Sequence, residues 1–163
     1  AEAVSFWAGV PRPGVDRSEA RRWLVEGISE YLEKTGELGV TAALEPEPGM
    51  LVETLDDYAS LAAELPGLEL ALDTGHCLVT GEREPSLAVE EFAGRIGTVS
   101  IEDMRRGVHE HLPFGQGDMD VPGVLRALED ASFGGLVCVE LSRESPRAHE
   151  AIPEAIGFLK GAR

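Results

Sequence analysis

The chain has 163 residues, of which 43% are hydrophobic, and carries a formal net charge of -16. This is enough for one domain with its own core, while the apolar runs are far too short to cross a bilayer. So acidic a surface repels nucleic acid unless a basic stripe is present, and the densest basic spots are the isolated pairs Arg21-Arg22 and Arg105-Arg106. We therefore expect a soluble protein without nucleic-acid or membrane partners.

The cysteines and the first residues bear on the compartment. Cys77 and Cys138 are the only cysteines, and both lie in apolar or strand-like segments. This fits a reducing cytoplasm better than a disulfide scaffold. Residues 1–7 lack a basic segment followed by a long apolar run, so we expect no signal peptide. The expected location is the cytoplasm.

Short β-like runs alternate with helical runs along the chain, without a linker, so we predict one domain over residues 1–163. The predicted strands are residues 4–8, 39–45, 68–73, 96–101 and 136–140. A capping box at Asp16-Arg17-Ser18-Glu19 predicts the first helix. Later helices are predicted at 54–65, 86–94 and 120–130, and a last helical stretch runs to about Lys160 with Pro153 interrupting or restarting it.

Five β-then-α units with apolar, β-branched strands predict a parallel α/β fold. A doubly wound sheet would carry a glycine-rich phosphate loop after the first strand, and the run Gly9–Gly14 is no such fingerprint. Polar residues instead cluster where strands end, as they do at the mouth of a barrel. The pattern favours a TIM (β/α)8 barrel.

Three predicted strands end in carboxylates: Glu45, Asp73 and Glu140. Strand ends converge on one mouth of a barrel, and three converging carboxylates repel each other unless a cation or a shared proton is present. A divalent metal is the common solution. Each acid taken singly is equally well explained as a solvated loop residue or a helix cap.

Three of the four histidines lie just beyond strand ends. His76 follows Asp73 by three residues, and His109 and His111 are expected on the same side of an extended segment because side chains alternate there. Such a pair is a workable chelate for zinc or manganese, although surface loop histidines explain a lone H-x-H as well. His149, in the last helix, is expected at the surface.

Four strings occur in an order that resembles the xylose-isomerase-like TIM barrel superfamily: Glu45–Gly49, Asp73-Thr74-Gly75-His76, His109–Gly117 and Val139–Ser142. The superfamily includes sugar isomerases and epimerases and the endonuclease IV type of phosphodiesterase, and the resemblance covers essentially the whole chain. It implies that Glu45, Asp73 and Glu140 hold a shared divalent metal (Zn, Mn or Mg). His76, His109 and His111 would form a second metal position.

Two departures from this family stand out. Ser100 occupies the position of a ligand histidine at the end of the seventh strand, where Glu102 or Asp103 are candidate substitutes. The first three βα units are also missing, so this chain would carry about the last five. An open five-stranded sheet has two unpaired edges. We therefore predict an incomplete barrel, completed by a missing N-terminal segment or by another chain in a homo-oligomer.

The resemblance implies a metal-dependent sugar or sugar phosphate isomerase or epimerase. Glu45 and Glu140 would act as base and acid beside a metal that polarises the substrate carbonyl, and His76 would contact the substrate or the metal. Arg143 would hold a phosphate or carboxylate, unless it is only a surface or capping residue.

Two alternatives remain open. The histidine cluster favours an endonuclease IV-like metal-dependent phosphodiesterase, which the charge of -16 disfavours. Ser100 favours a non-catalytic protein that binds or hands on a small metabolite. This agrees with a similarity of residues 45–50, 102–117 and 140–143 to the Ebo-cluster metabolite-traffic barrel proteins.

Several neighbouring residues have expected structural roles. Gly75, Gly115 and Gly117 are expected to permit tight turns. Trp7 and Phe114 are expected to pack in the interior, the alternative being an apolar wall over a substrate. Cys77 is expected to be an inert buried thiol, the alternative being a soft metal ligand beside His76.

Overall fold

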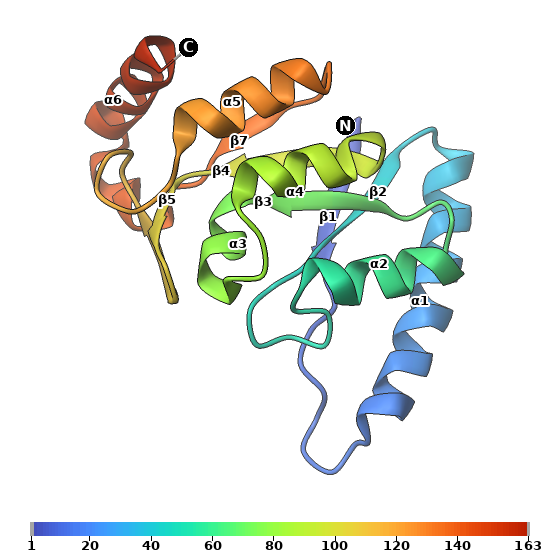
Figure 1. Ribbon diagram of the computed structural model, residues 1–163. Helices are drawn as coiled ribbons and strands as arrows, with labels where there is room; N and C mark the ends of the chain where they lie inside the picture. The colour runs from blue at the N-terminus through green and yellow to red at the C-terminus, as the bar shows by residue number, and fades with distance from the viewer. Residues whose placement is uncertain (1, 163) are drawn as a thin grey trace. The chain divides into compact units, whose positions relative to one another are not determined.

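The computed structural model describes residues 2–162, so Ala1 and Arg163, the two limits of the predicted domain, lie outside the described residues. Five strands form one sheet in the order β1-β2-β3-β4-β7 (Figure 1). β1 pairs with β2, β2 with β3 and β4 with β7, each in parallel. These strands are Ala3–Trp7, Thr41–Glu45, Glu69–Asp73, Ile96–Ile101 and Val137–Val139.

The part of the chain that the structure describes also forms six α-helices, two short 3-10 helices and a hairpin. The α-helices α1 to α6 are Arg17–Glu37, Leu55–Glu64, Thr74–Thr80, Pro85–Phe92, Val121–Asp130 and Ala148–Gly161. The 3-10 helices are Ala93–Arg95 and Ser142–Arg147. β5 (Asp103–Arg105) and β6 (Val108–Leu112) pair antiparallel in a separate two-stranded sheet.

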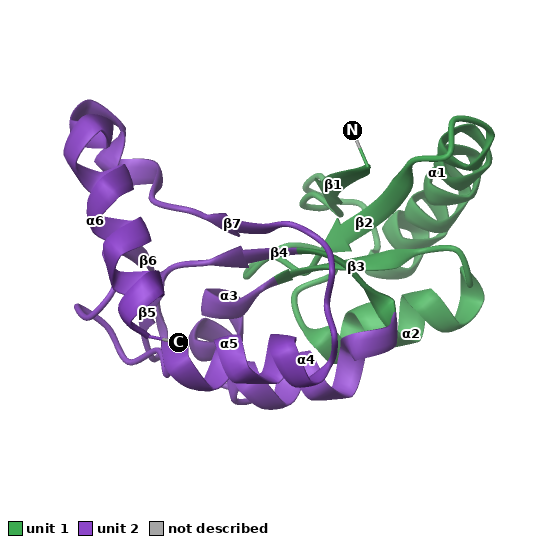
Figure 2. Ribbon diagram, turned by 90° about the horizontal axis from the view of Figure 1, so that it is seen from above, with its two compact units in different colours: residues 1–72, 95–98 green, residues 73–94, 99–163 purple. Residues whose placement is uncertain are grey.

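The chain divides into two compact units (Figure 2). Unit 1 contains the residues up to Leu72 together with Arg95–Thr98, and unit 2 contains Asp73–Gly94 and the residues from Val99 onward. Unit 1 thus holds β1, α1, β2 and α2, whereas unit 2 holds helices α3 to α6, the hairpin and β7. The prediction of a single domain stays a prediction.

Helix starts follow the local signals in the sequence. Asp16 caps α1 by accepting a hydrogen bond from Ser18 N at 2.8 Å. Thr54 and Asp57 form a reciprocal capping box at the start of α2. Asp120 caps α5 by accepting from Gly123 N at 3.0 Å. A side-chain oxygen at each start satisfies a backbone N–H that has no partner within the helix.

The central strands and the edge strands of the sheet differ in burial. In unit 1, Leu44 of β2 and Leu70 and Leu72 of β3 are at most 1% exposed, as expected for parallel strands covered on both faces. At one end of the strand order, Trp7 of β1 is 58% exposed. The prediction that Trp7 packs in the interior is therefore wrong, because its strand is at an edge.

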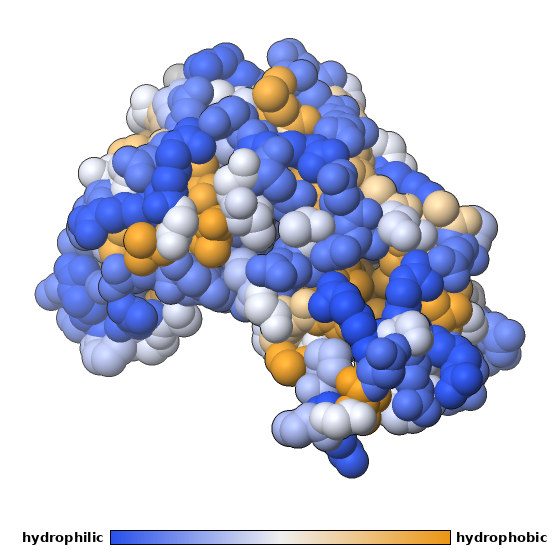
Figure 3. Space-filling model, turned by 60° about the horizontal axis from the view of Figure 1, so that its bottom comes forward, coloured by the Kyte–Doolittle hydropathy of each residue, from blue (hydrophilic) through white to orange (hydrophobic). Residues whose placement is uncertain are grey.

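β7, at the other end of the strand order, is exposed along its whole length. Its Val137 and Val139, and Leu136 just before it, are among the large apolar residues with high exposure. Figure 3 shows orange apolar patches within a largely blue surface. Two exposed edge strands confirm the expected open sheet of an incomplete barrel.

Three elements differ from the prediction. α3 begins at Thr74 directly after β3, where we expected a loop. The chain after β4 turns back on itself as the β5–β6 hairpin, with Gly107 in the left-handed region at φ 72°. α6 continues through Pro153 to Gly161, so Pro153 does not interrupt it. No helix among the described residues has both the length and the apolar character needed to cross a membrane.

Candidate metal centre

The first part of the site is the junction between β3 and α3. Asp73, the last residue of β3, is the N-cap of α3, and its Oδ1 accepts a hydrogen bond from His76 N at 3.0 Å. Its Oδ2 lies 3.7 Å from His76 Nε2. Both residues are buried, and Asp73 Oδ2 has no hydrogen-bond partner among residues 2–162. A buried carboxylate oxygen without a partner is costly, and a cation would satisfy it.

Gly75 allows other residues to pack closely beneath this helix. A Cβ at Gly75 would lie 2.1 Å from Glu102 Oε1 and 2.7 Å from Met104 Cε. Its φ is not positive, so the expected role in a tight turn is wrong. The position excludes a side chain because Glu102 and Met104 occupy the space.

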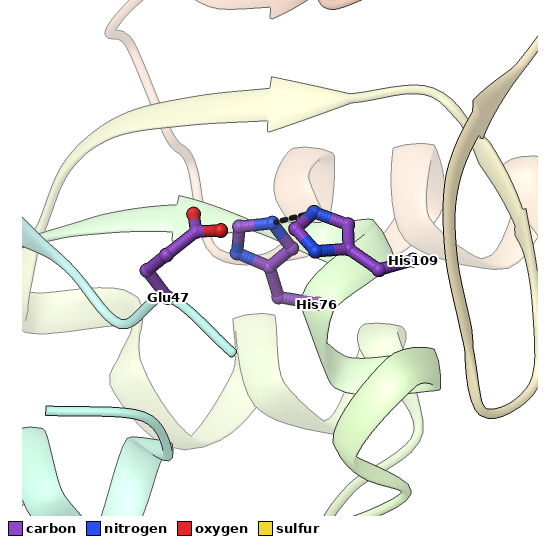
Figure 4. A group of neighbouring side chains, drawn as sticks. All are labelled: Glu47, His76 and His109. Carbon is purple, nitrogen blue, oxygen red and sulfur yellow. Dashed lines mark hydrogen bonds between the residues drawn. The ribbon is translucent and has the colours of Figure 1, made fainter. Parts of the chain in front are cut away.

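His109 of β6 approaches His76 of α3. Their Nε2 atoms are 3.2 Å apart and their rings meet edge to face, with centroids 4.9 Å apart (Figure 4). Figure 4 also labels Glu47, which belongs to unit 1. Two imidazole nitrogens on one tetrahedral zinc, with Zn–N bonds of 2.0–2.1 Å, are separated by about 3.3 Å. The spacing of the two imidazoles therefore fits two ligands of one metal ion.

His111 extends the series of imidazoles along β6. Its ring centroid is 5.5 Å from that of His109, which confirms that the two side chains share a face of the strand. His111 Nε2 lies 4.0 Å from an oxygen of Glu140, the residue after β7. Unit 2 thus places five ligand-type side chains in one series: Asp73, His76, His109, His111 and Glu140.

Glu45 belongs to unit 1. It is the last residue of β2, as predicted, and is 9% exposed. β2 pairs in parallel with β3 through Leu44 opposite Leu70, so both strands end in carboxylates at their carboxyl ends.

Residues at and just after the end of β4 form hydrogen bonds that were not predicted from the sequence. The carbonyl of Ser100 accepts a hydrogen bond from Thr74 Oγ1 at 3.2 Å. Asp103 is 1% exposed, and its two carboxylate oxygens accept from the backbone N–H groups of Gly115, Gly117 and Met119. Asp103 therefore holds a loop through three backbone hydrogen bonds. A signal was available: Asp103 is followed 12 and 14 residues later by the glycines of a G-x-G string.

The glycines of this loop differ in role. Gly115 has a φ of 86°, which confirms the expected turn function. A Cβ at Gly117 would lie 2.3 Å from Asp103 Oδ1, so Gly117 allows a close approach instead.

The remaining candidates lie at or near this region. Arg143 Nη1 donates to a carboxylate oxygen of Glu110, and both side chains are solvent-accessible. His149 is at the surface, as expected, with 78% of its side chain exposed. Phe114 stacks on Phe158 with ring centroids 5.2 Å apart. Cys77 is buried, as expected, and burial raises the pKa of its thiol.

The open parallel sheet and the acids and imidazoles beyond its strands are typical of a (β/α)-barrel protein, in which functional residues lie at the carboxyl ends of the strands. The chain belongs to the xylose isomerase-like TIM barrel family, whose model matches residues 1–162. This membership confirms the predicted fold class and the predicted resemblance.

Comparisons with individual proteins agree with the family. L-ribulose-5-phosphate 3-epimerase UlaE of Escherichia coli is 26% identical over 139 residues, which cover 82% of this chain and 49% of that protein. A D-tagatose 3-epimerase-like protein superimposes with a TM-score of 0.78 at 22% identity, over 99% of this chain and 64% of that one. The IolI protein with a bound zinc atom superimposes with a TM-score of 0.79 at 23% sequence identity. The match covers 99% of this chain and 62% of that one. The chain spans about half the length of the curated relatives it matches.

Proposed function

We propose that this chain is the ligand-bearing part of a divalent-metal-dependent sugar or sugar phosphate epimerase or isomerase. The observation that carries the proposal is the approach of His76 Nε2 to His109 Nε2 at 3.2 Å beside the unpartnered Asp73 Oδ2. The epimerase UlaE supports the reaction class, and a D-allulose 3-epimerase in complex with D-allulose is among the structural neighbours.

The metal would be held by residues from both predicted ligand sets. Asp73, His76 and His109 form the first group, and His111 with Glu140 forms an adjacent pair. Glu45, at the carboxyl end of β2, is the proposed carboxylate ligand from unit 1. Three imidazoles favour zinc over magnesium, while the carboxylates also suit manganese. When bound, the ion supplies the positive charge that polarises a substrate carbonyl and its neighbouring hydroxyl.

Glu45 and Glu140 are the proposed proton-transfer groups. Epimerisation next to a carbonyl removes a proton from one face of the carbon and returns one to the opposite face, which requires two groups. Glu45 is buried, whereas the Glu140 side chain is 42% exposed and lies near His111. We assign removal and return of the proton to this pair, with His76 contacting a substrate oxygen or the metal.

Arg143 is proposed to anchor a phosphate or carboxylate of the substrate. Its guanidinium pairs with Glu110, and 66% of the Arg143 side chain is exposed. An exposed ion pair contributes at most about 1 kcal/mol, so a substrate anion can compete with Glu110 for the guanidinium.

The exposed edges of β1 and β7 support the presence of additional strands in the active protein. Unpaired parallel strand edges are covered in a closed barrel. We propose that further βα units, preceding this chain in a longer polypeptide or supplied by a second copy, complete the wall.

The test combines metal analysis with isotope exchange. The protein as purified is expected to contain zinc or manganese by elemental analysis, and to exchange the hydrogen beside the carbonyl of a ketose substrate with deuterated water. Glu140→Gln is expected to keep the metal through the remaining proposed ligands, with its amide oxygen still able to coordinate, and to lose the exchange. Unchanged exchange on an identified sugar would remove Glu140 from proton transfer, and absence of metal would contradict the proposal as a whole.

A second candidate function is metal-assisted phosphodiester hydrolysis, which the series His76, His109 and His111 favours. Binding to a duplex with an abasic site at low salt would support it, since the net charge of -16 opposes such binding. Bound metal without turnover on a sugar panel would instead favour a metabolite-binding protein.

A further inference from the structure

Asp103 is a buried carboxylate that lies outside the proposed ligand set. It begins β5 and is 1% exposed. Its Oδ2 accepts from Gly115 N at 2.8 Å and Gly117 N at 2.9 Å, and its Oδ1 accepts from Met119 N at 3.0 Å. Hydrogen bonds to an ionised acceptor are stronger than those between neutral groups, and here one side chain collects three.

These three donors lie in the segment that leaves β6. Asp103 is the register partner of Leu112, the residue directly after His111. The carboxylate therefore ties the start of the hairpin to the chain just beyond its second strand. We call the three hydrogen bonds from Gly115 N, Gly117 N and Met119 N to the Asp103 carboxylate the Asp103 clamp. A further bond, from Asp118 N to the carbonyl of Met104 at 2.8 Å, lies beside it.

The clamp leaves no space for a side chain at Gly117. A Cβ there would lie 2.3 Å from Asp103 Oδ1 and 2.5 Å from Met104 O. Gly117→Ala thus breaks the same contact from the opposite side, which provides a second variant that leaves the Asp103 side chain itself unaltered.

The hairpin depends on such ties because two strands alone are marginally stable in water. At its turn, Gly107 N donates to the carbonyl of Leu78 in α3 at 3.0 Å. At its other end, the Asp103 clamp holds the chain. Between these two points lie His109 and His111, and His109 meets His76 of the same helix α3.

We infer that Asp103 is a positioning residue of the metal centre, because its clamp on residues 115–119 holds the His109-x-His111 strand against His76. The inference rests on the proposed function for the metal itself. It assigns Asp103 no contact with metal or substrate.

The variants are Asp103→Asn and Gly117→Ala, with Asp120→Asn as the matched control. The amide in Asp103→Asn replaces an acceptor by a donor that faces backbone N–H groups. Asp120→Asn makes the same chemical change at an N-cap that accepts from Gly123 N, where asparagine serves equally well. Zinc affinity, measured by competition with a chromophoric chelator, is expected to fall about 10- to 100-fold in both clamp variants and to stay unchanged in the control.

A metal-free measurement separates this inference from the proposed function. The wild-type protein is expected to show an NMR contact between the His76 and His109 rings and slow amide exchange at Gly115 and Gly117. Both signals should be lost in the clamp variants. If the wild-type protein shows both signals but binds no zinc, the Asp103 clamp is supported and the proposed metal centre is contradicted.

Two results would overturn the inference. One is fast exchange of these amides in the wild-type protein, which is informative even if Asp103→Asn does not fold. The other is a clamp variant that loses thermal stability while keeping both the zinc affinity and the ring contact, because Asp103 would then stabilise the fold without positioning the histidines.

Discussion

Unit 1 and unit 2 use the ends of their strands differently. In unit 1, β2 ends at Glu45 and the chain proceeds through a loop to α2, which begins at the Thr54 capping box. In unit 2, β4 is followed by a hairpin before α5 begins. That hairpin carries His109 and His111, and all four histidines belong to unit 2. Two of the imidazoles thus occur where the chain departs from simple β-then-α alternation, whereas His76 lies in α3 directly after β3.

The largest expected effect is loss of a buried imidazole in unit 2. His76→Ala removes an imidazole that lies next to both Asp73 and His109, from a residue that is only 5% exposed. Zinc affinity should fall more than about 100-fold, because losing even an outer partner of a ligand costs 10- to 100-fold. Competition with a chelator measures the change. His149→Ala is the control, since its exposed side chain pairs with Glu150 at the surface; equal losses in both variants would contradict the assignment.

The next effect concerns the packing beneath α3. Gly75→Ala places a Cβ 2.1 Å from Glu102 Oε1 and 2.8 Å from Met104 Sδ, so the helix or these side chains must move. Overpacking of this kind costs about 1–3 kcal/mol in the free energy of unfolding, measured by urea titration. Gly94→Ala meets nothing within 4 Å and should be nearly neutral. A Gly75→Ala protein as stable as Gly94→Ala would mean that the contact is absent in solution.

A smaller effect is expected in the core of unit 1. Tyr58 is 1% exposed and its hydroxyl donates to the carbonyl of Leu68 at 3.0 Å. Tyr58→Phe should cost about 1 kcal/mol of unfolding free energy through loss of this hydrogen bond. Zinc affinity should not change, because neither Tyr58 nor Leu68 is among the proposed ligands. A changed affinity would mean that the packing of unit 1 contributes to metal binding.

The same tyrosine gives a pH prediction. Burial raises the pKa of Tyr58 from 10.0 to about 12. The folded state therefore holds the phenolic proton more tightly than the unfolded state does. The resulting stability is fully present below pH 10 and declines as the pH rises from 10 toward 12. Unfolding midpoints measured across this range should decline less steeply in Tyr58→Phe, and identical slopes would contradict burial of the hydroxyl.

Much of the local structure could be predicted because it depends on residues a few positions apart. Asp16, Thr54 and Asp120 each cap a helix by binding an N–H two or three residues ahead. The alternation along a strand placed His109 and His111 on one face. The predicted interruption of the last helix at Pro153 is wrong, because α6 continues through this residue although proline lacks a backbone N–H donor.

By itself, the sequence determined the five strands of the main sheet, most of the helices, the carboxylates at Glu45 and Asp73, and the membership of the barrel family, because local patterns and motif order carry that information. Only the tertiary structure decided which groups meet. His76 and His109 are 33 residues apart in the sequence, and Asp103 accepts a hydrogen bond from Gly115, which is 12 residues away. The hairpin, the clamp and the exposed edges of β1 and β7 depend on such distant contacts, since residues far apart in the chain form them only once the fold has brought them together.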